Sequence, residues 1–203
     1  MIELRSDGET LRAELYGELP ARRAAILVHG KNWDAAGWRP FAARFASSGV
    51  PALALNLRGY GGSTGTTNEY QPPAPWTPVV DLRAAKAYLR DRGVAEIALV
   101  GCSLGGHAVI GSSLERDVEC VASVSAPVVA VPERISRAVS GRKLYLCASD
   151  DGAMPHVLAS FAALAEPKRL TVFGGTEHAI GMFHASYGDD ALRALIEFVA
   201  KGL

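Results

Sequence analysis

The chain has 203 residues, of which 49% are hydrophobic and 21% are charged, and its 21 Lys and Arg balance its 21 Asp and Glu. This length predicts a single domain spanning residues 1–203, and the apolar content excludes a disordered chain. A net charge of zero provides no field for a phosphate backbone, so we expect no nucleic-acid partner. Composition leaves the oligomeric state open.

The N-terminus and the cysteines bear on the cellular compartment. Residues 1–7 contain no apolar run typical of a signal peptide, and no stretch approaches the roughly 18 apolar residues of a membrane span. Cys102, Cys120 and Cys147 each lie in an apolar run, which predicts buried free thiols in a reducing compartment. We therefore expect a cytoplasmic protein with no membrane partner.

The first predicted element is a β-hairpin. Residues 3–5 and 11–15 alternate polar and apolar side chains on either side of Asp7 and Gly8. This pattern is typical of two antiparallel strands at one edge of a sheet.

After the hairpin, short apolar runs alternate with helical patterns. The predicted strands are residues 25–28, 52–55, 97–100, 120–124, 143–147 and 169–173, and the predicted helices are residues 77–92, 154–165 and 189–201. Strands that are apolar throughout are typical of a sheet covered by helices on both faces. The alternation therefore predicts an α/β fold with a mostly parallel, twisted sheet and right-handed crossovers.

The first predicted helix has a recognisable apolar side. Val80, Ala84 and Tyr88 recur at helical spacing, so we expect them to face the core. Asp81 and Lys86 are expected to point away from it.

A nucleophile motif follows the strand at residues 97–100. The segment 101–105, Gly-Cys-Ser-Leu-Gly, matches the G-x-S-x-G nucleophile elbow, in which only small residues fit two positions before and after the serine. Ser103 is therefore the candidate nucleophile, and the backbone N–H of Leu104, at a helix N-terminus, points where an oxyanion would form. The alternative interpretation is a glycine-rich turn of a nucleotide-binding fold.

Serine needs a base to become a nucleophile. His178 follows the last predicted strand and is the first candidate, while His184, six residues further on, is the second. His107 lies one turn into the helix behind Ser103, so we expect it to be a packed or surface histidine.

The base in turn needs an orienting acid, and two carboxylates follow the strand at residues 143–147. We expect one of Asp150 and Asp151 to join the triad and the other to cap the helix that starts near Met154. The order serine, aspartate, histidine along the chain is that of α/β-hydrolases.

At this point the sequence resembles the α/β-hydrolase family over nearly its whole length. The resemblance rests on residues 27–30 (strand and H-G oxyanion loop), 56–63 (D-x-R-G-x-G-x-S segment), 148–155 (acid loop) and 174–178 (histidine loop). It implies Asp151 as the acid and the backbone N–H of Lys31 as a second oxyanion donor. Asn56 replaces the usual aspartate, and we expect this change to affect only loop support.

A second departure concerns the lid. Few residues separate Pro127 from Lys143, so the resemblance implies a member of the family without a cap domain and with an open site. Loop and helix side chains are then expected to form the substrate pocket: Trp33, Trp38, Tyr60, Trp76, Met154, Met182 and Phe183.

The sequence therefore predicts a serine hydrolase that cleaves small carboxylic esters through an acyl-enzyme. No cofactor or metal is expected, because neither H-E-x-x-H nor paired C-x-x-C occurs. A thioesterase or peptidase with the same triad, a lyase or C–C hydrolase, and a non-catalytic binding module remain open. A flavodoxin-like nucleotide-binding protein is disfavoured, because residues 29–33 are bulky rather than glycine-rich.

Overall fold

The computed structural model of the chain describes residues 1–68, 76–126 and 139–201. Within these ranges the strands form one eight-stranded sheet in the order β1-β2-β4-β3-β5-β6-β7-β8. The strands are β1 (Ile2–Ser6), β2 (Glu9–Tyr16), β3 (Arg23–Val28), β4 (Ala52–Leu55), β5 (Glu96–Cys102), β6 (Cys120–Val124), β7 (Arg142–Ala148) and β8 (Lys168–Phe173).

Strand pairing confirms the predicted architecture. β1 pairs antiparallel with β2, and β2 pairs antiparallel with β4, whereas β3 to β8 are parallel. Val28 of β3 lies opposite both Leu55 of β4 and Gly101 of β5. The carboxyl ends of these three strands therefore meet at one edge of the sheet.

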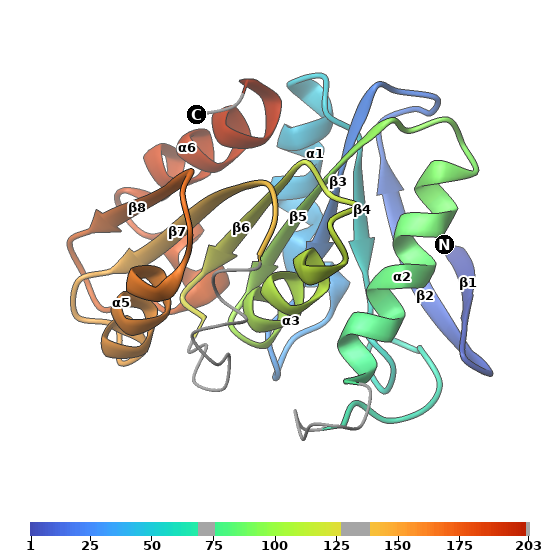
Figure 1. Cartoon of the computed structure of the whole chain (residues 1–203), viewed down its shortest axis with the longest axis horizontal. Coiled ribbons are helices and arrows are strands. Elements are labelled where there is room, and N and C mark those ends of the chain that lie inside the picture. The colour runs from blue at the N-terminus through green and yellow to red at the C-terminus, as the bar shows by residue number, and fades with distance from the viewer. Residues whose placement is uncertain (69–75, 127–138, 202–203) are drawn as a thin grey trace.

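Helices cover both faces of the sheet. They are α1 (Arg39–Ser47), α2 (Thr77–Arg90), α3 (Leu104–Ser112), α5 (Met154–Ala163) and α6 (Gly188–Lys201), with 3-10 turns η1 (Ala35–Trp38), η2 (Ser113–Glu115) and η3 (Ala179–His184). The helices α2, α3 and α5 cover the face toward the viewer, and α1 lies behind the sheet (Figure 1). One core cluster packs α2, α3 and α5 on the sheet, and a second packs α1 and α6.

The sequence pattern did not predict α1, although its signals are present. Pro40 occupies the first turn, where a missing N–H costs nothing. Phe41, Ala42 and Phe45 then face the second core cluster. The helix is held by this packing, because nine residues are too few for stability on propensity alone.

The expected orientation of α2 is confirmed for Ala84 and Tyr88, which pack partly buried against the first core cluster, but it is wrong for Asp81 and Lys86. Its buried side chains include Leu82, Asp81 and Lys86, while Val80 and Tyr88 are only partly buried. The Lys86 Nζ atom donates to Glu115 at 2.7 Å and to Asp117 at 2.9 Å, so its charge is paired rather than solvated. Charged groups can be buried in this way only when such partners are supplied.

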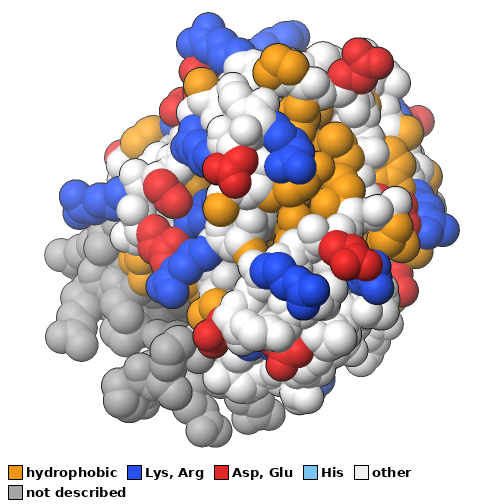
Figure 2. Space-filling view, turned by 90° about the vertical axis from the view of Figure 1, so that its right-hand side faces the viewer, with side chains coloured by type: hydrophobic (Ala, Val, Ile, Leu, Met, Phe, Trp, Pro, Cys, Tyr) orange, Lys and Arg blue, Asp and Glu red, His pale blue; other side chains and the backbone are white. Residues whose placement is uncertain are grey.

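The hairpin strand β1 forms one edge of the sheet. Figure 2 views this side of the molecule and shows hydrophobic side chains gathered at the surface between basic and acidic groups. Ile2, Leu15 and Leu19 are only partly buried where they pack against the first core cluster.

The connection between β6 and β7 consists of residues 125–141 only, which is too short to hold an inserted cap domain. Residues 127–138 lie outside the described part of the chain. Among the described helices, none is long and apolar enough to cross a membrane.

Candidate active site

Ser103 lies on a sharp turn between the end of β5 and the start of α3. Its backbone has φ +51° and ψ −115°, a strained conformation for a residue with a side chain. A Cβ at Gly101 would collide with the carbonyl oxygen of Gly105, and a Cβ at Gly105 would collide with that of Val28. The close approach of these three backbones explains the small residues on both sides of Ser103.

Asp151 and His178 come together at the ends of β7 and β8. The His178 Nδ1 atom lies 3.0 Å from Asp151 Oδ1 and 2.9 Å from Oδ2. An ionised carboxylate only accepts hydrogen bonds, so Nδ1 carries the proton and Nε2 is left as an acceptor. The Asp151 side chain is 4% exposed, whereas that of His178 is 43% exposed.

The buried carboxylate of Asp151 has two further donors. Its Oδ1 atom accepts from the N–H of Ala153 at 2.9 Å, and Cys147 Sγ lies 3.8 Å from Oδ2. Together these contacts fix the carboxylate plane that faces His178.

The neighbouring candidates lie elsewhere. Asp150 is exposed, and its carboxylate accepts from Ser149 Oγ at 2.7 Å. The expectation that the second carboxylate caps α5 is therefore wrong, because Asp151 itself contacts the N–H that precedes this helix. His184 is exposed and packs edge-on against the ring of Phe41 at 5.1 Å between centroids.

The loop that carries His178 is anchored by residues that the sequence analysis missed. Tyr187 donates its hydroxyl to Glu177 Oε2 at 2.9 Å, and its ring stacks on Phe173 with centroids 5.0 Å apart. Hydrogen bonds from its own backbone N–H and then from Tyr187 lower the pKa of Glu177. No local sequence signal identifies Tyr187, because it reaches this loop only through the fold.

The loop after β3 lies against the elbow. The position of a Cβ on Gly30 would be 3.3 Å from Ser103 Cβ, so the backbone of this loop borders the serine. The first N–H groups of α3, including that of Leu104, have no intrahelical acceptor. Within the described ranges, no acceptor is found for the backbone N–H of Leu104 or of Lys31.

His29 connects this loop to the one after β4. Its Nδ1 atom lies 2.8 Å from the carbonyl oxygen of Gly30, and its Nε2 atom accepts from the N–H of Leu57 at 3.2 Å. These partners require the neutral tautomer with the proton on Nδ1. Burial lowers the pKa of His29, which is 1% exposed.

Asn56 supports the same pair of loops. Its Oδ1 atom accepts from the N–H of Ala35 at 2.7 Å, and its Nδ2 atom donates to the carbonyl oxygen of Gly61 at 3.4 Å. An aspartate could accept the first bond but could not donate the second. The amide at this position therefore has a specific role in tying the two loops together.

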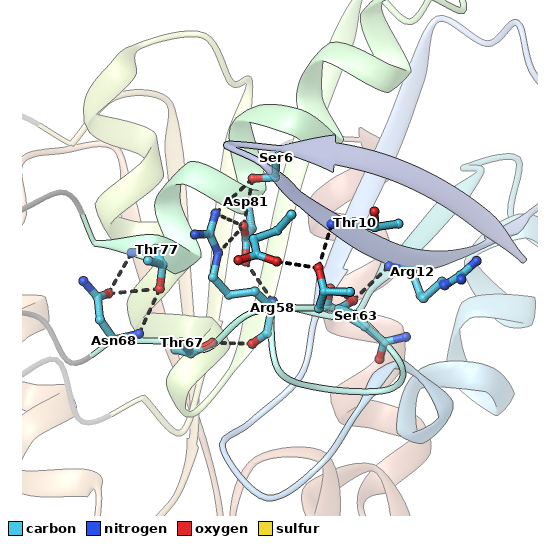
Figure 3. Close-up of polar contacts among 12 residues, drawn as sticks. Ser6, Thr10, Arg12, Arg58, Ser63, Thr67, Asn68, Thr77 and Asp81 are labelled. Carbon is cyan, nitrogen blue, oxygen red and sulfur yellow. Dashed lines mark hydrogen bonds and ion pairs between the residues drawn. The ribbon is translucent and has the colours of Figure 1, made fainter.

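A buried ion pair anchors the loop after β4 to α2 and β1 (Figure 3). Arg58 donates to Asp81 Oδ1 from Nε at 2.9 Å and from Nη2 at 2.7 Å, and its backbone N–H donates to Oδ2 at 2.9 Å. Ser6 Oγ donates to the same carboxylate at 2.9 Å. Asp81 is fully buried and the Arg58 side chain is 7% exposed, so the pair is shielded from water.

Three of the expected pocket residues lie near the edge of the sheet that carries Ser103. Trp33 is 38% exposed and its ring lies beside Gly30. Tyr60 is half-buried and packs on the ring of His29, with centroids 4.7 Å apart. Met154 is half-buried at the first position of α5.

The other expected pocket residues are in the core. Met182 is fully buried, and Phe183 packs against Phe41 and Trp38, the last also fully buried. The expectation that Met182, Phe183 and Trp38 line a pocket is therefore wrong. Trp76 is 6% exposed, and its ring packs on that of His107 at 4.6 Å between centroids.

His107 and the thiols are unsuited to act as base or nucleophile. Burial lowers the pKa of His107 to about 4. All three cysteines are buried and free, and burial raises the pKa of Cys120 and of Cys147 to about 11. Across the described residues, no group of three or more His, Cys, Asp or Glu side chains could hold a metal ion.

Comparison with known proteins places this architecture in a family. The sequence profile described as the alpha/beta hydrolase family matches residues 25–198. Because this match covers most of the sequence, the chain belongs to the alpha/beta hydrolase family. Membership of this family supports a hydrolase activity.

Solved structures share the fold at low sequence identity. A predicted CIB-like hydrolase from Thermoplasma acidophilum has a TM-score of 0.80 at 20% identity, covering 97% of this chain and 95% of its own. Est1E from Butyrivibrio proteoclasticus, with ferulic acid bound, has a TM-score of 0.82 at 15% identity, covering 98% and 97%. A monoacylglycerol lipase from Paleococcus ferrophilus has a TM-score of 0.76 at 16% identity, covering 95% and 99%. No curated protein matches the sequence significantly.

Proposed function

We propose that the protein is a serine hydrolase that cleaves carboxylic esters of small substrates. The observation that carries this proposal is the Asp151–His178 pair, formed at the sheet edge where the strained turn presents Ser103. The similarity to a structure described as a monoacylglycerol lipase supports an ester as the substrate.

In the proposed reaction, Ser103 Oγ attacks the ester carbonyl carbon while its proton passes to His178 Nε2. Asp151 holds the proton of Nδ1 and stabilises the imidazolium that forms. The tetrahedral intermediate then collapses, and His178 gives the proton to the departing alcohol. Water, deprotonated by the same nitrogen, next attacks the acyl-enzyme and releases the acid and Ser103.

The developing oxyanion is expected to accept from the backbone N–H groups of Lys31 and Leu104. Each such donor contributes roughly 2.7–4 kcal/mol to transition-state stabilisation. Among the described residues, no hydrogen bond joins Ser103 Oγ to His178. In sites without substrate this bond is often long, and it tightens when substrate binds.

Small, soluble esters are the proposed substrates. The short connection between β6 and β7 has no room for a cap domain that could enclose a long acyl chain. We therefore expect acetate and butyrate esters to be cleaved faster than long-chain esters. A higher kcat/KM for a long-chain ester would contradict this substrate class.

The nucleophile is tested with Ser103→Ala. This variant should lose both the turnover of 4-nitrophenyl acetate and labelling by a fluorophosphonate, because both require the hydroxyl. Retained labelling in a folded Ser103→Ala variant would exclude Ser103 as the nucleophile. A parallel panel of matched ester, thioester and amide substrates identifies the preferred bond.

The base is tested with two histidine variants. His178→Ala should be nearly inactive, whereas His184→Ala, which removes the exposed imidazole on Phe41, should keep most of the activity. The reverse result would assign the base to His184.

A further inference from the structure

One tryptophan is exposed next to the proposed nucleophile. Trp38 is fully buried and Trp76 is 6% exposed, but Trp33 is 38% exposed. The other exposed large hydrophobic side chains in the described ranges belong to Met1, Leu158 and Val172, on the N-terminus, α5 and β8. An indole left partly in water is therefore unusual in this molecule.

The position of the indole is defined by Gly30. The point that a Cβ of Gly30 would occupy lies 3.0 Å from Trp33 Cε3, 3.3 Å from Cζ3 and 3.3 Å from Ser103 Cβ. The six-membered ring of Trp33 and the Ser103 side chain therefore both border Gly30. A substrate group that extends from the reacting carbonyl toward Gly30 would meet the indole.

The backbone around Trp33 is held by hydrogen bonds although the indole is exposed. Its own N–H donates to the carbonyl oxygen of Gly30 at 3.2 Å, and the N–H of Ala35 donates to Asn56 at 2.7 Å. The Asp34 carboxylate accepts from the N–H of Ala36 at 2.8 Å and begins η1. Because the backbone is fixed on both sides of Trp33, a ligand that packs on the ring does not have to order this loop.

We propose that Trp33 is a stacking platform for a planar aromatic group of the substrate, on the acyl or the alcohol side of the ester. This inference rests on the proposed function, since it places the aromatic group beside the carbonyl that Ser103 attacks. A flat ring gains offset-stacked or edge-to-face contacts with an indole that a puckered aliphatic ring of the same size cannot make. The site would therefore select aryl esters over their saturated counterparts.

The kinetic test uses matched pairs of substrates. Methyl benzoate and methyl cyclohexanecarboxylate test the acyl side, and phenyl acetate and cyclohexyl acetate test the alcohol side. Trp33→Leu keeps an apolar side chain but removes the flat ring, so it should lower kcat/KM for the aromatic member of one pair on the order of tenfold. Its effect on the saturated member should be much smaller, and Trp33→Phe should keep the aromatic preference.

The control variant is Leu158→Ala, which truncates an exposed side chain on α5 that is 48% exposed. It should leave the preference for the aromatic ester unchanged. If Trp33→Leu lowers both members of each pair equally, or lowers neither, the platform is overturned.

A binding measurement separates this proposal from the proposed function. Ligand-observed NMR should show that wild type and Trp33→Phe bind benzamide more tightly than cyclohexanecarboxamide, and that Trp33→Leu loses this preference. If a fluorophosphonate labels Ser103 but the preference does not depend on Trp33, the platform fails and the hydrolase assignment stands. If Ser103 is not labelled but the preference follows Trp33, the hydrolase assignment fails and Trp33 is an aromatic-binding site without a role in ester cleavage.

Discussion

Two buried carboxylates in this protein have partners of different chemistry. Asp81 is fully buried and binds the guanidinium of Arg58, whose side chain is 7% exposed. Asp151 is 4% exposed and binds the imidazole of His178, whose side chain is 43% exposed. Both carboxylates also accept a backbone N–H, from Arg58 and Ala153 respectively.

The difference lies in what the nitrogen partner can do. Arginine stays protonated under all conditions in which proteins fold, so the Arg58–Asp81 pair can only hold the loop after β4 in place. Histidine can gain and lose a proton near neutral pH, and its second nitrogen is left as an acceptor. A buried carboxylate therefore holds a loop in place in one region, at Asp81. In the other region, in our proposal, the carboxylate of Asp151 supports proton transfer by His178.

The largest expected effect comes from Asp151→Asn. An amide would donate to His178 Nδ1 and force the proton onto Nε2, so kcat should fall roughly 10⁴-fold. The asparagine Oδ1 can still accept from Ala153, so the free energy of unfolding should change by only about 1 kcal/mol. Ester turnover and urea unfolding measure the two quantities.

The matched control for this prediction is Asp150→Asn, which changes the adjacent exposed carboxylate. It should leave kcat within about twofold of wild type, because no charge that faces His178 is altered. A comparable loss of kcat in both variants would mean that Asp151 affects activity only by supporting the loop after β7, and not by orienting the imidazole of His178.

The second prediction concerns stability rather than activity. Asp81→Asn leaves the buried guanidinium of Arg58 without its counter-charge, which should lower the free energy of unfolding by about 3–5 kcal/mol. The control Asp189→Asn removes an exposed partner of Arg44 and should cost less than about 1 kcal/mol. If the two variants melt alike, burial of the Arg58–Asp81 pair has no energetic consequence.

The smallest expected effect is on pH dependence and involves His29. Because its pKa is lowered in the folded protein, the unfolded chain binds more protons as the pH falls below the ordinary value of 6.5. Protonated Nε2 would also face the N–H of Leu57 and lose that bond. The free energy of unfolding should therefore fall between pH 7.5 and pH 5, and fall less in His29→Gln. Equal losses in both proteins, measured by denaturant unfolding, would contradict this assignment.

Local patterns predicted the parallel sheet and the candidate site because strand ends are visible in the sequence. Ser103, Asp151 and His178 each follow an apolar run, and parallel strands bring such positions to one edge. The pattern of α2 predicted an outward Asp81, but its carboxylate is buried because Arg58, 23 residues earlier in the chain, and Ser6 donate to it. The pocket prediction for Met182 and Phe183 is wrong, because an apolar residue near a catalytic motif has the same pattern whether it packs inward or outward.

The sequence by itself determined the strand–helix alternation, the strained turn at Ser103 and the family of the fold, because each depends on neighbouring residues. The residues alone left Asp150 and Asp151 open and the resemblance to the family favoured Asp151, but only the tertiary structure shows which carboxylate meets His178. It also decided which tryptophan is left in water beside Ser103. Those properties depend on contacts between segments far apart in the chain, and no local periodicity records them.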